Sequence, residues 1–192
     1  METIKIYTED ILDKSTELHY AFHSSLSDIT IKHTHDFYEI FLITNGSVKH
    51  IINNHEQIIS AGTLVFIRPT DVHYYAKYNN SQVELLNLAF PKYVIDELLS
   101  YLGDGFDSKR LLKSKLAPSI ILSGTEKKIL INRFEKLHLL PLNQRSETRT
   151  ALRILLAEII TNYFSRDFWL EKNGIPKWLE MTRIEMQKKE NF

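Results

Sequence analysis

Two histidines and a glutamate lie close together in the chain, as His33, His35 and Glu39. In an extended strand successive side chains alternate between the two faces, so these three odd-numbered residues would point to one side. Imidazole nitrogens and carboxylate oxygens are common ligands of divalent transition metals. We therefore expect one strand that carries all three side chains on one face and forms part of a divalent-metal site.

The residues around Glu39 are apolar on both faces of that strand. Phe37, Phe41 and Ile43 share the face of the glutamate, and the opposite face carries Tyr38, Ile40 and Leu42. A strand that is apolar on both faces must be covered on both. The pattern predicts a second layer of structure on the outside of this sheet.

Short extended segments separated by turn residues fill the chain between residues 3 and 90. Asn53-Asn54 suits a hairpin turn, and Arg68-Pro69 ends an apolar run. The expected strands cover residues 3–7, 18–23, 37–43, 47–52, 57–59, 63–67, 72–78 and 83–90. Many short strands at close spacing favour a sandwich or a barrel.

Helical spacing replaces this pattern after residue 90. One helix is expected over 91–102, a second from the capping box Ser123–Glu126 through Leu137, a third over about 146–164 and a short one from Pro176. A run of strands followed by a run of helices predicts an all-β barrel with helices on its outer face or at one end.

The composition narrows the class of protein. The chain has 192 residues, no cysteine, and 24 basic residues against 24 acidic ones. Thiolate metal sites are excluded, and zero net charge argues against nucleic-acid binding by this chain alone. The sequence contains no secretory leader pattern and no apolar stretch approaching the ~20 residues of a membrane span. We expect a cytoplasmic protein.

The spacing of these residues resembles a known family. His33-x-His35-x3-Glu39-x6-Gly46 is similar to the first cupin motif, and the segment from Gly62 to His73 resembles the second, which supplies a further histidine. This resemblance implies a mainly β protein with some α, in which a jelly-roll cupin barrel is followed by helices.

Residues 31–75 more closely resemble the sensor barrel of AraC-type transcription regulators, through HTHDFYEIF (33–41), GTLVFIRP (62–69) and DVH (71–73). Residues 175–179 and 186–192 resemble the connector of the branch that senses chitobiose- or cellobiose-like sugars. The implied organisation is a sensing barrel over 1–90, a helical dimerisation region over 91–175 and a connector over 176–192. The connector would lead to a helix-turn-helix domain absent from this chain, through which alone DNA would be bound.

The resemblance implies that His33, His35, Glu39 and His73 hold one divalent ion, which could be zinc, nickel, iron, cobalt or manganese. The alternative is that these histidines serve without metal, as hydrogen-bonding groups in a sugar pocket. Both interpretations remain open at this point. The glutamate spacing and the partner histidine favour metal.

Four further residues are expected to contact a sugar or sugar-phosphate effector. Tyr75 has the parity of His73, so with Phe37 and Phe41 it is a candidate to stack on a sugar ring. Arg68, at a strand end, suits hydroxyl or phosphate oxygens, or else a surface salt bridge. His19 and His23 share a face of one early strand and could reach the pocket, although surface positions are favoured, and His50 and His55 are expected in solvent.

The apolar stripe of the long helix has two interpretations. It is a homodimer interface, or it packs on the outer face of the chain's own barrel, and one helix can do both. The stripe consists of Leu152, Leu155, Leu156, Ile159 and Tyr163.

Two functions follow from these residues. The first is a ligand-sensing and dimerisation domain of an AraC-type regulator, which is not an enzyme. The alternative is a small metal-dependent cupin enzyme, such as an isomerase or dioxygenase, that uses the same four residues. The extensive helical region, and the lack of a further acid–base constellation in the sequence, favour the sensor.

Overall fold

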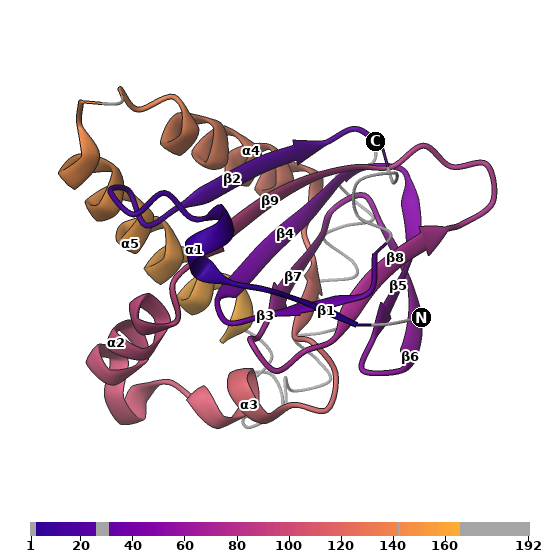
Figure 1. The fold of residues 1–192 in the computed structure, drawn as a ribbon, viewed down its shortest axis with the longest axis horizontal. Coiled ribbons are helices and arrows are strands. Elements are labelled where there is room, and N and C mark those ends of the chain that lie inside the picture. Colours follow the sequence, from indigo (N-terminus) through magenta and orange to yellow (C-terminus); the bar gives the residue numbers. More distant parts are fainter. Residues whose placement is uncertain (1–2, 26–30, 142, 166–192) are drawn as a thin grey trace, which may run out of the picture.

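Two five-stranded sheets form the barrel in the computed structural model, which describes residues 3–25, 31–141 and 143–165 (Figure 1). The first sheet has the order β1-β3-β8-β5-β6 and the second β10-β7-β4-β9-β2. The strands are β1 (Ile4–Ile6), β2 (His19–His23), β3 (His33–His35), β4 (Tyr38–Asn45), β5 (Ser47–Ile52), β6 (His55–Ser60), β7 (Thr63–Ile67), β8 (His73–Lys77), β9 (Glu84–Phe90) and β10 (Ser119–Ile121). The expected double-sheet barrel followed by helices is confirmed.

Most of the helices lie against the outside of the second sheet (Figure 1). They are α2 (Lys92–Leu102), α3 (Ser108–Lys113), α4 (Gly124–His138) and α5 (Arg145–Ile159), with short turns η2 (Gly103–Gly105) and η3 (Ile160–Phe164). The short helix α1 (Thr8–Ile11) differs, because its Ile11 packs against Phe37 and Ala89 at the mouth of the barrel. The capping box that opens α4 is present, because Ser123 and Glu126 each accept from the other's backbone N–H. None of the described helices is long and apolar enough to cross a membrane.

β4 separates two cores. Phe41 and Ile43 point into the barrel, while Ile40 and Leu42 pack with the helices on the other side. All four side chains are fully buried. The prediction that a second layer covers this strand is therefore confirmed, and the helices supply that layer.

The apolar stripe of α5 belongs to this layer. Leu152, Leu156 and Ile159 are 0% exposed and Leu155 is 5% exposed, and Tyr163 packs partly buried against the same core. These side chains already cover the chain's own barrel, so a second copy could not contact them without opening the core. This packing favours the alternative interpretation of the stripe over a dimer interface. Two apolar side chains of the helical layer are exposed instead, Ile129 on α4 and Ile154 on α5.

One barrel strand comes from beyond residue 90. β10 pairs antiparallel with β7, with Ser119 opposite Val65 and Ile121 opposite Thr63. The barrel therefore does not end at residue 90, and a division of the chain at that point leaves out an edge strand. Three residues are too few for an alternating pattern to indicate a strand. The expected connector over 176–192 lies outside the described residues.

Gly46, between β4 and β5, should not tolerate a side chain. Its φ is +72°, and a Cβ there would lie 1.8 Å from the Gln82 carbonyl oxygen. We expect Gly46→Ala to lower the free energy of unfolding by about 2 kcal/mol or more, since strain and a clash add. Urea denaturation measures the loss. The control is Gly105→Ala, where nothing lies within 4 Å of the added Cβ. Equal losses of stability in the two variants would show that strain and the clash at Gly46 are not the cause.

Candidate metal and ligand site

The two halves of the first motif lie on different sheets. His33 and His35 are on β3, which pairs with β1 and β8, whereas Glu39 is on β4, which pairs with β7 and β9. The chain crosses from one sheet to the other between these strands. The expectation of a single strand was therefore wrong, and the histidine and glutamate side chains meet across the barrel interior.

His73 joins them from β8, where it is the direct cross-strand partner of His33. One ligand atom each from His33, Glu39 and His73 lies within 4.8 Å of the others. Two ligands of one zinc ion lie at most about 4.2 Å apart, twice the metal–ligand distance. Small side-chain rotations would bring these three atoms onto one ion.

Backbone carbonyls orient two of the imidazoles. His33 Nδ1 is 2.8 Å from the Ile31 carbonyl oxygen, and His35 Nδ1 is 2.7 Å from that of Phe37. Only a protonated ring nitrogen can donate to a carbonyl, so each Nε2 keeps its lone pair. His35 Nε2 lies 3.5 Å from Glu39 Oε2. Three of the four predicted ligands thus form the cluster, and His35 lies beside its carboxylate.

Burial sets the charges of the site. Desolvation lowers the pKa of His35 to about 4 and that of His73 well below its usual value, so both rings are neutral near pH 7. Burial also raises the pKa of Glu39 to about 8, a rise that a hydrogen bond from Asn87 partly offsets. Neutral imidazole is the form that binds a metal, and a cation would favour the ionised form of Glu39.

The donor atoms fit a divalent metal. Within the described part of the chain, both ring nitrogens of His73 and Nε2 of His35 are buried without a hydrogen-bond partner. A buried polar atom left in this way costs about 1–3 kcal/mol. Nitrogen lone pairs beside a carboxylate suit zinc, nickel, iron, cobalt or manganese.

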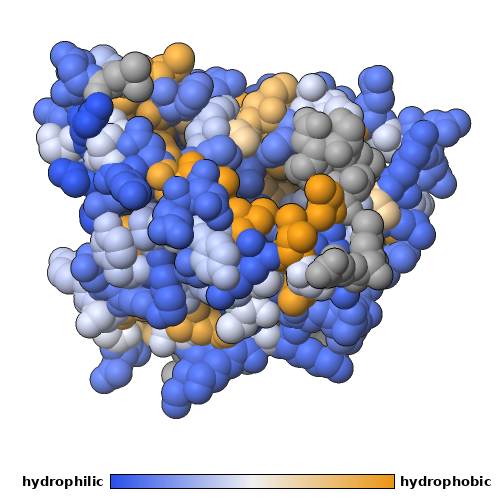
Figure 2. Space-filling view, in the orientation of Figure 1, coloured by the Kyte–Doolittle hydropathy of each residue, from blue (hydrophilic) through white to orange (hydrophobic). Residues whose placement is uncertain are grey.

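A cavity of about 220 Å³ opens onto this cluster. Phe37, Tyr75, Leu85 and Asn87 line it beside Glu39, and its outer part is formed by His19, His23 and four isoleucines: Ile4, Ile6, Ile11 and Ile31. Figure 2 shows a cluster of apolar side chains near the centre of an otherwise largely hydrophilic face, over the region of α1, β1 and β3. A larger cleft of about 750 Å³ lies between α1 and the start of α2, but none of the histidines lines it.

The predicted sugar contacts divide into three groups. Phe37 and Tyr75 line the cavity, as a ligand contact requires. Phe41 lies in the barrel core, edge-on to Tyr75 at 5.4 Å between ring centroids. Arg68 belongs neither to the lining of the cavity nor to the apolar core of the barrel.

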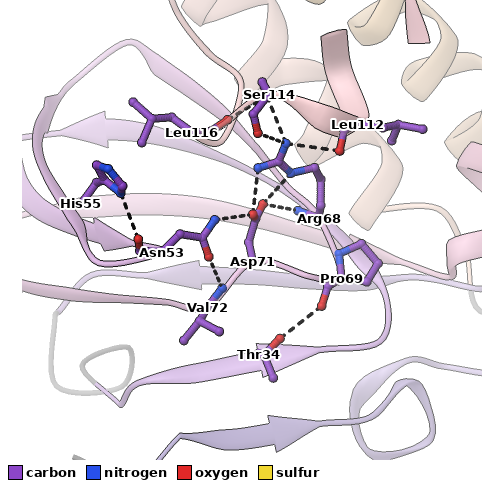
Figure 3. A network of polar contacts seen from close by, with 10 residues as sticks. All are labelled: Thr34, Asn53, His55, Arg68, Pro69, Asp71, Val72, Leu112, Ser114 and Leu116. Atoms are coloured by element: carbon purple, nitrogen blue, oxygen red, sulfur yellow. Dashed lines mark hydrogen bonds and ion pairs between the residues drawn. The ribbon is translucent and has the colours of Figure 1, made fainter. Parts of the chain in front are cut away.

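Arg68 is at the centre of a buried polar network (Figure 3). Its Nε lies 2.9 Å from Asp71 Oδ2 and its Nη2 2.8 Å from Asp71 Oδ1, while Nη1 donates to the Ser114 carbonyl at 2.7 Å. Asp71 Oδ1 also accepts from Asn53. These contacts engage the guanidinium within the chain, which favours a structural role over effector binding. The surface salt bridge is wrong as well, because both side chains are buried.

His50 was expected in solvent, and that expectation was wrong. It is 0% exposed, stacks on Tyr75 at 5.1 Å and lies 5.7 Å from the His73 ring. The signal was its parity with Val48 and Ile52, which are apolar and buried on the same face of β5. His55 is exposed, as expected, whereas His19 and His23 line the cavity mouth.

The two sheets and the inward-facing histidine and glutamate side chains define a barrel of the cupin type. The family model "AraC-like ligand binding domain" matches residues 19–116, about half of the chain, and the chain therefore belongs to that family.

Two known proteins illustrate the similarity. The activator RhaR of Escherichia coli K12 is 36% identical over 53 residues, which are 28% of this chain and 19% of RhaR. The match thus spans about a fifth of the length of that relative. The crystal structure of apo ToxT K231A from Vibrio cholerae has a TM-score of 0.59 at 14% identity and covers 82% of this chain and 58% of ToxT. At that identity it shows the fold alone.

Proposed function

We propose that this chain is the ligand-sensing domain of an AraC-type transcription regulator that responds to a sugar or sugar phosphate. The observation that carries the proposal is the cavity that opens onto His33 and Glu39 within a barrel of this family. His33, Glu39 and His73 would hold a divalent ion, with His35 beside them. When bound, the ion would supply a Lewis-acidic centre for hydroxyl or phosphate oxygens of the effector.

The size of the cavity favours a small effector. Its volume of about 220 Å³ is below the roughly 300–1,000 Å³ of pockets for drug-sized ligands. A single sugar ring suits this space better than a disaccharide such as chitobiose or cellobiose. A disaccharide would require the segment that carries Ile4, Ile6 and Ile11 to move aside.

β4 offers a physical link between effector and helices. Glu39 and Phe41 face the barrel interior, and the residues between and after them pack on the helical layer. An effector that binds one arrangement of this strand more tightly would shift the population of the helical layer. We propose that a homodimer, and a DNA-binding domain outside this chain, respond to that shift.

The same ligands would suit a metal-dependent cupin enzyme. Membership of a ligand-binding family supports the sensor. Turnover of a bound sugar, followed as product in the binding mixture, would favour the enzyme instead.

Thermal unfolding with monosaccharides, their phosphates and disaccharides, with and without zinc or manganese, tests the effector class. An effector at about 100 times its Kd should add about 2.7 kcal/mol of stability. We expect single-ring sugars to stabilise the metal-loaded protein most. A larger shift with disaccharides would contradict the size argument, and no shift with any of these compounds would contradict the sugar class.

Metal affinity should depend on pH through Glu39. Because burial raises its pKa to about 8, a proton competes with the metal below that pH. His73 contributes little, since desolvation holds its pKa well below the usual value, and burial also lowers the pKa of His33. We expect affinity to rise up to about tenfold per pH unit from about pH 6 to pH 8 and then to level off.

Competition with a chromophoric chelator at each pH measures this dependence. Glu39→Gln should bind metal weakly and lose most of the pH dependence. A flat profile in the unmodified protein would show that Glu39 is not a ligand.

A further inference from the structure

His50 is a buried imidazole beside the metal cluster that the ligand set does not use. It lies on β5, between β6 and β8 in the sheet. Its cross-strand partner on β6 is Gln57, whose amide nitrogen lies 3.1 Å from His50 Nδ1. On the β8 side lies His73, with 5.7 Å between ring centroids and the rings at 89°.

Hydrogen-bond roles follow from this order. An amide N–H that donates to Nδ1 leaves the ring proton of His50 on Nε2. That Nε2 is buried and has no hydrogen-bond partner among the described residues, and the same holds for both ring nitrogens of His73. The two rings are therefore neighbours, and each carries a buried nitrogen that lacks a partner among the described residues.

A metal-bound His73 needs a different arrangement. Its lone pair would bind the ion, so its other ring nitrogen carries a proton and requires an acceptor. His50 can accept only through a deprotonated Nε2, which places its proton on Nδ1. Nδ1–H in turn requires an acceptor, and Gln57 offers one if its amide turns its oxygen toward the ring.

We propose that Gln57 and His50 form a hydrogen-bond relay that positions His73, and that metal binding requires the Gln57 amide to present its oxygen to His50. The inference rests on the proposed metal site. In the change, one proton leaves Nε2 of His50 and another is added at Nδ1, so the ring stays neutral. The relay would connect the metal state to β6, where Gln57 is partly exposed.

Substitutions at Gln57 separate the two orientations. In Gln57→Glu the carboxylate can only accept, which holds His50 in the metal-competent tautomer. In Gln57→Lys the ammonium can only donate, which holds the other tautomer. We expect zinc affinity to be equal or higher in Gln57→Glu, and about 10–100-fold lower in Gln57→Lys. Matched controls are Ile58→Glu and Ile58→Lys, which place the same charges at the exposed neighbouring position of β6.

Chelator competition measures these affinities, and ¹⁵N NMR of the histidine rings identifies the tautomers. We expect His50 to carry Nε2–H in the metal-free protein and Nδ1–H in Gln57→Glu and in the zinc-loaded protein. Affinity changes that equal those of the Ile58 controls would overturn the relay, as would one tautomer in all three samples. If the unmodified protein binds no zinc, the metal site fails, yet a tautomer change in Gln57→Glu would still support the link from Gln57 to His50.

Discussion

Asp71→Ala is expected to lower the free energy of unfolding by about 3–5 kcal/mol, because it leaves the Arg68 guanidinium buried without its anion. Arg68 is 4% exposed and Asp71 1% exposed, so water cannot replace the lost contact at little cost. The same carboxylate also accepts from the Arg68 backbone N–H and from Asn53. Removal of this carboxylate therefore separates the turn that carries Asn53 from the loop that carries Arg68. Urea denaturation, followed by far-UV circular dichroism, measures the loss of stability.

A surface ion pair provides the control for Asp71. Lys49 and Glu56 lie 2.8 Å apart on neighbouring strands, but Glu56 is exposed and Lys49 is only partly buried. Glu56→Ala should cost less than about 1 kcal/mol. If both variants lose the same stability, the network around Arg68 is not a structural anchor. Asp71 lies two residues before His73, so we also expect Asp71→Ala to weaken metal binding.

His73→Leu is expected to weaken zinc binding about 100-fold or more without destabilising the metal-free protein. Four-ligand zinc sites contribute about 10–16 kcal/mol, so one ligand accounts for about 3 kcal/mol. In the metal-free protein, leucine replaces a buried ring whose nitrogens have no partner among the described residues. Removing such a group with an apolar side chain of similar size is often neutral or stabilising.

Metal content by elemental analysis and affinity by chelator competition test this expectation, with urea denaturation of the metal-free protein alongside. His55→Leu is the control, since His55 is exposed and lies outside the cluster. Unchanged affinity in His73→Leu would remove His73 from the ligand set. A large loss of metal-free stability would mean that the ring has a structural role of its own.

Local sequence patterns predicted most of the strands and the three long helices. Alternation around Ile40 and Phe41 indicated a strand covered on both faces, and the capping box at Ser123 marked the start of α4. These features depend on neighbours in sequence. By contrast, α1, α3 and β10 were not predicted, because each spans only 3–6 residues and gains its stability from the surfaces it contacts.

The spacing of the motif predicted that His33, Glu39 and His73 lie together, but for a reason that the structure corrects. Parity within one strand suggested that His33, His35 and Glu39 share a face, whereas β3 and β4 belong to different sheets. The pairing of β3 with β8 brings His73 opposite His33. Which sheet a strand joins depends on hydrogen bonds to distant segments, and local alternation carries no information about them.

The sequence by itself determined the barrel class, the apolar faces of the strands, and the residue types for a metal site. Only the tertiary structure decided which of these residues meet. It turned Arg68 toward Asp71, buried His50 beside His73, and assigned the α5 stripe to the chain's own core. The physical reason is that side-chain chemistry and alternation are properties of each segment, whereas burial and pairing are set by the elements packed around it.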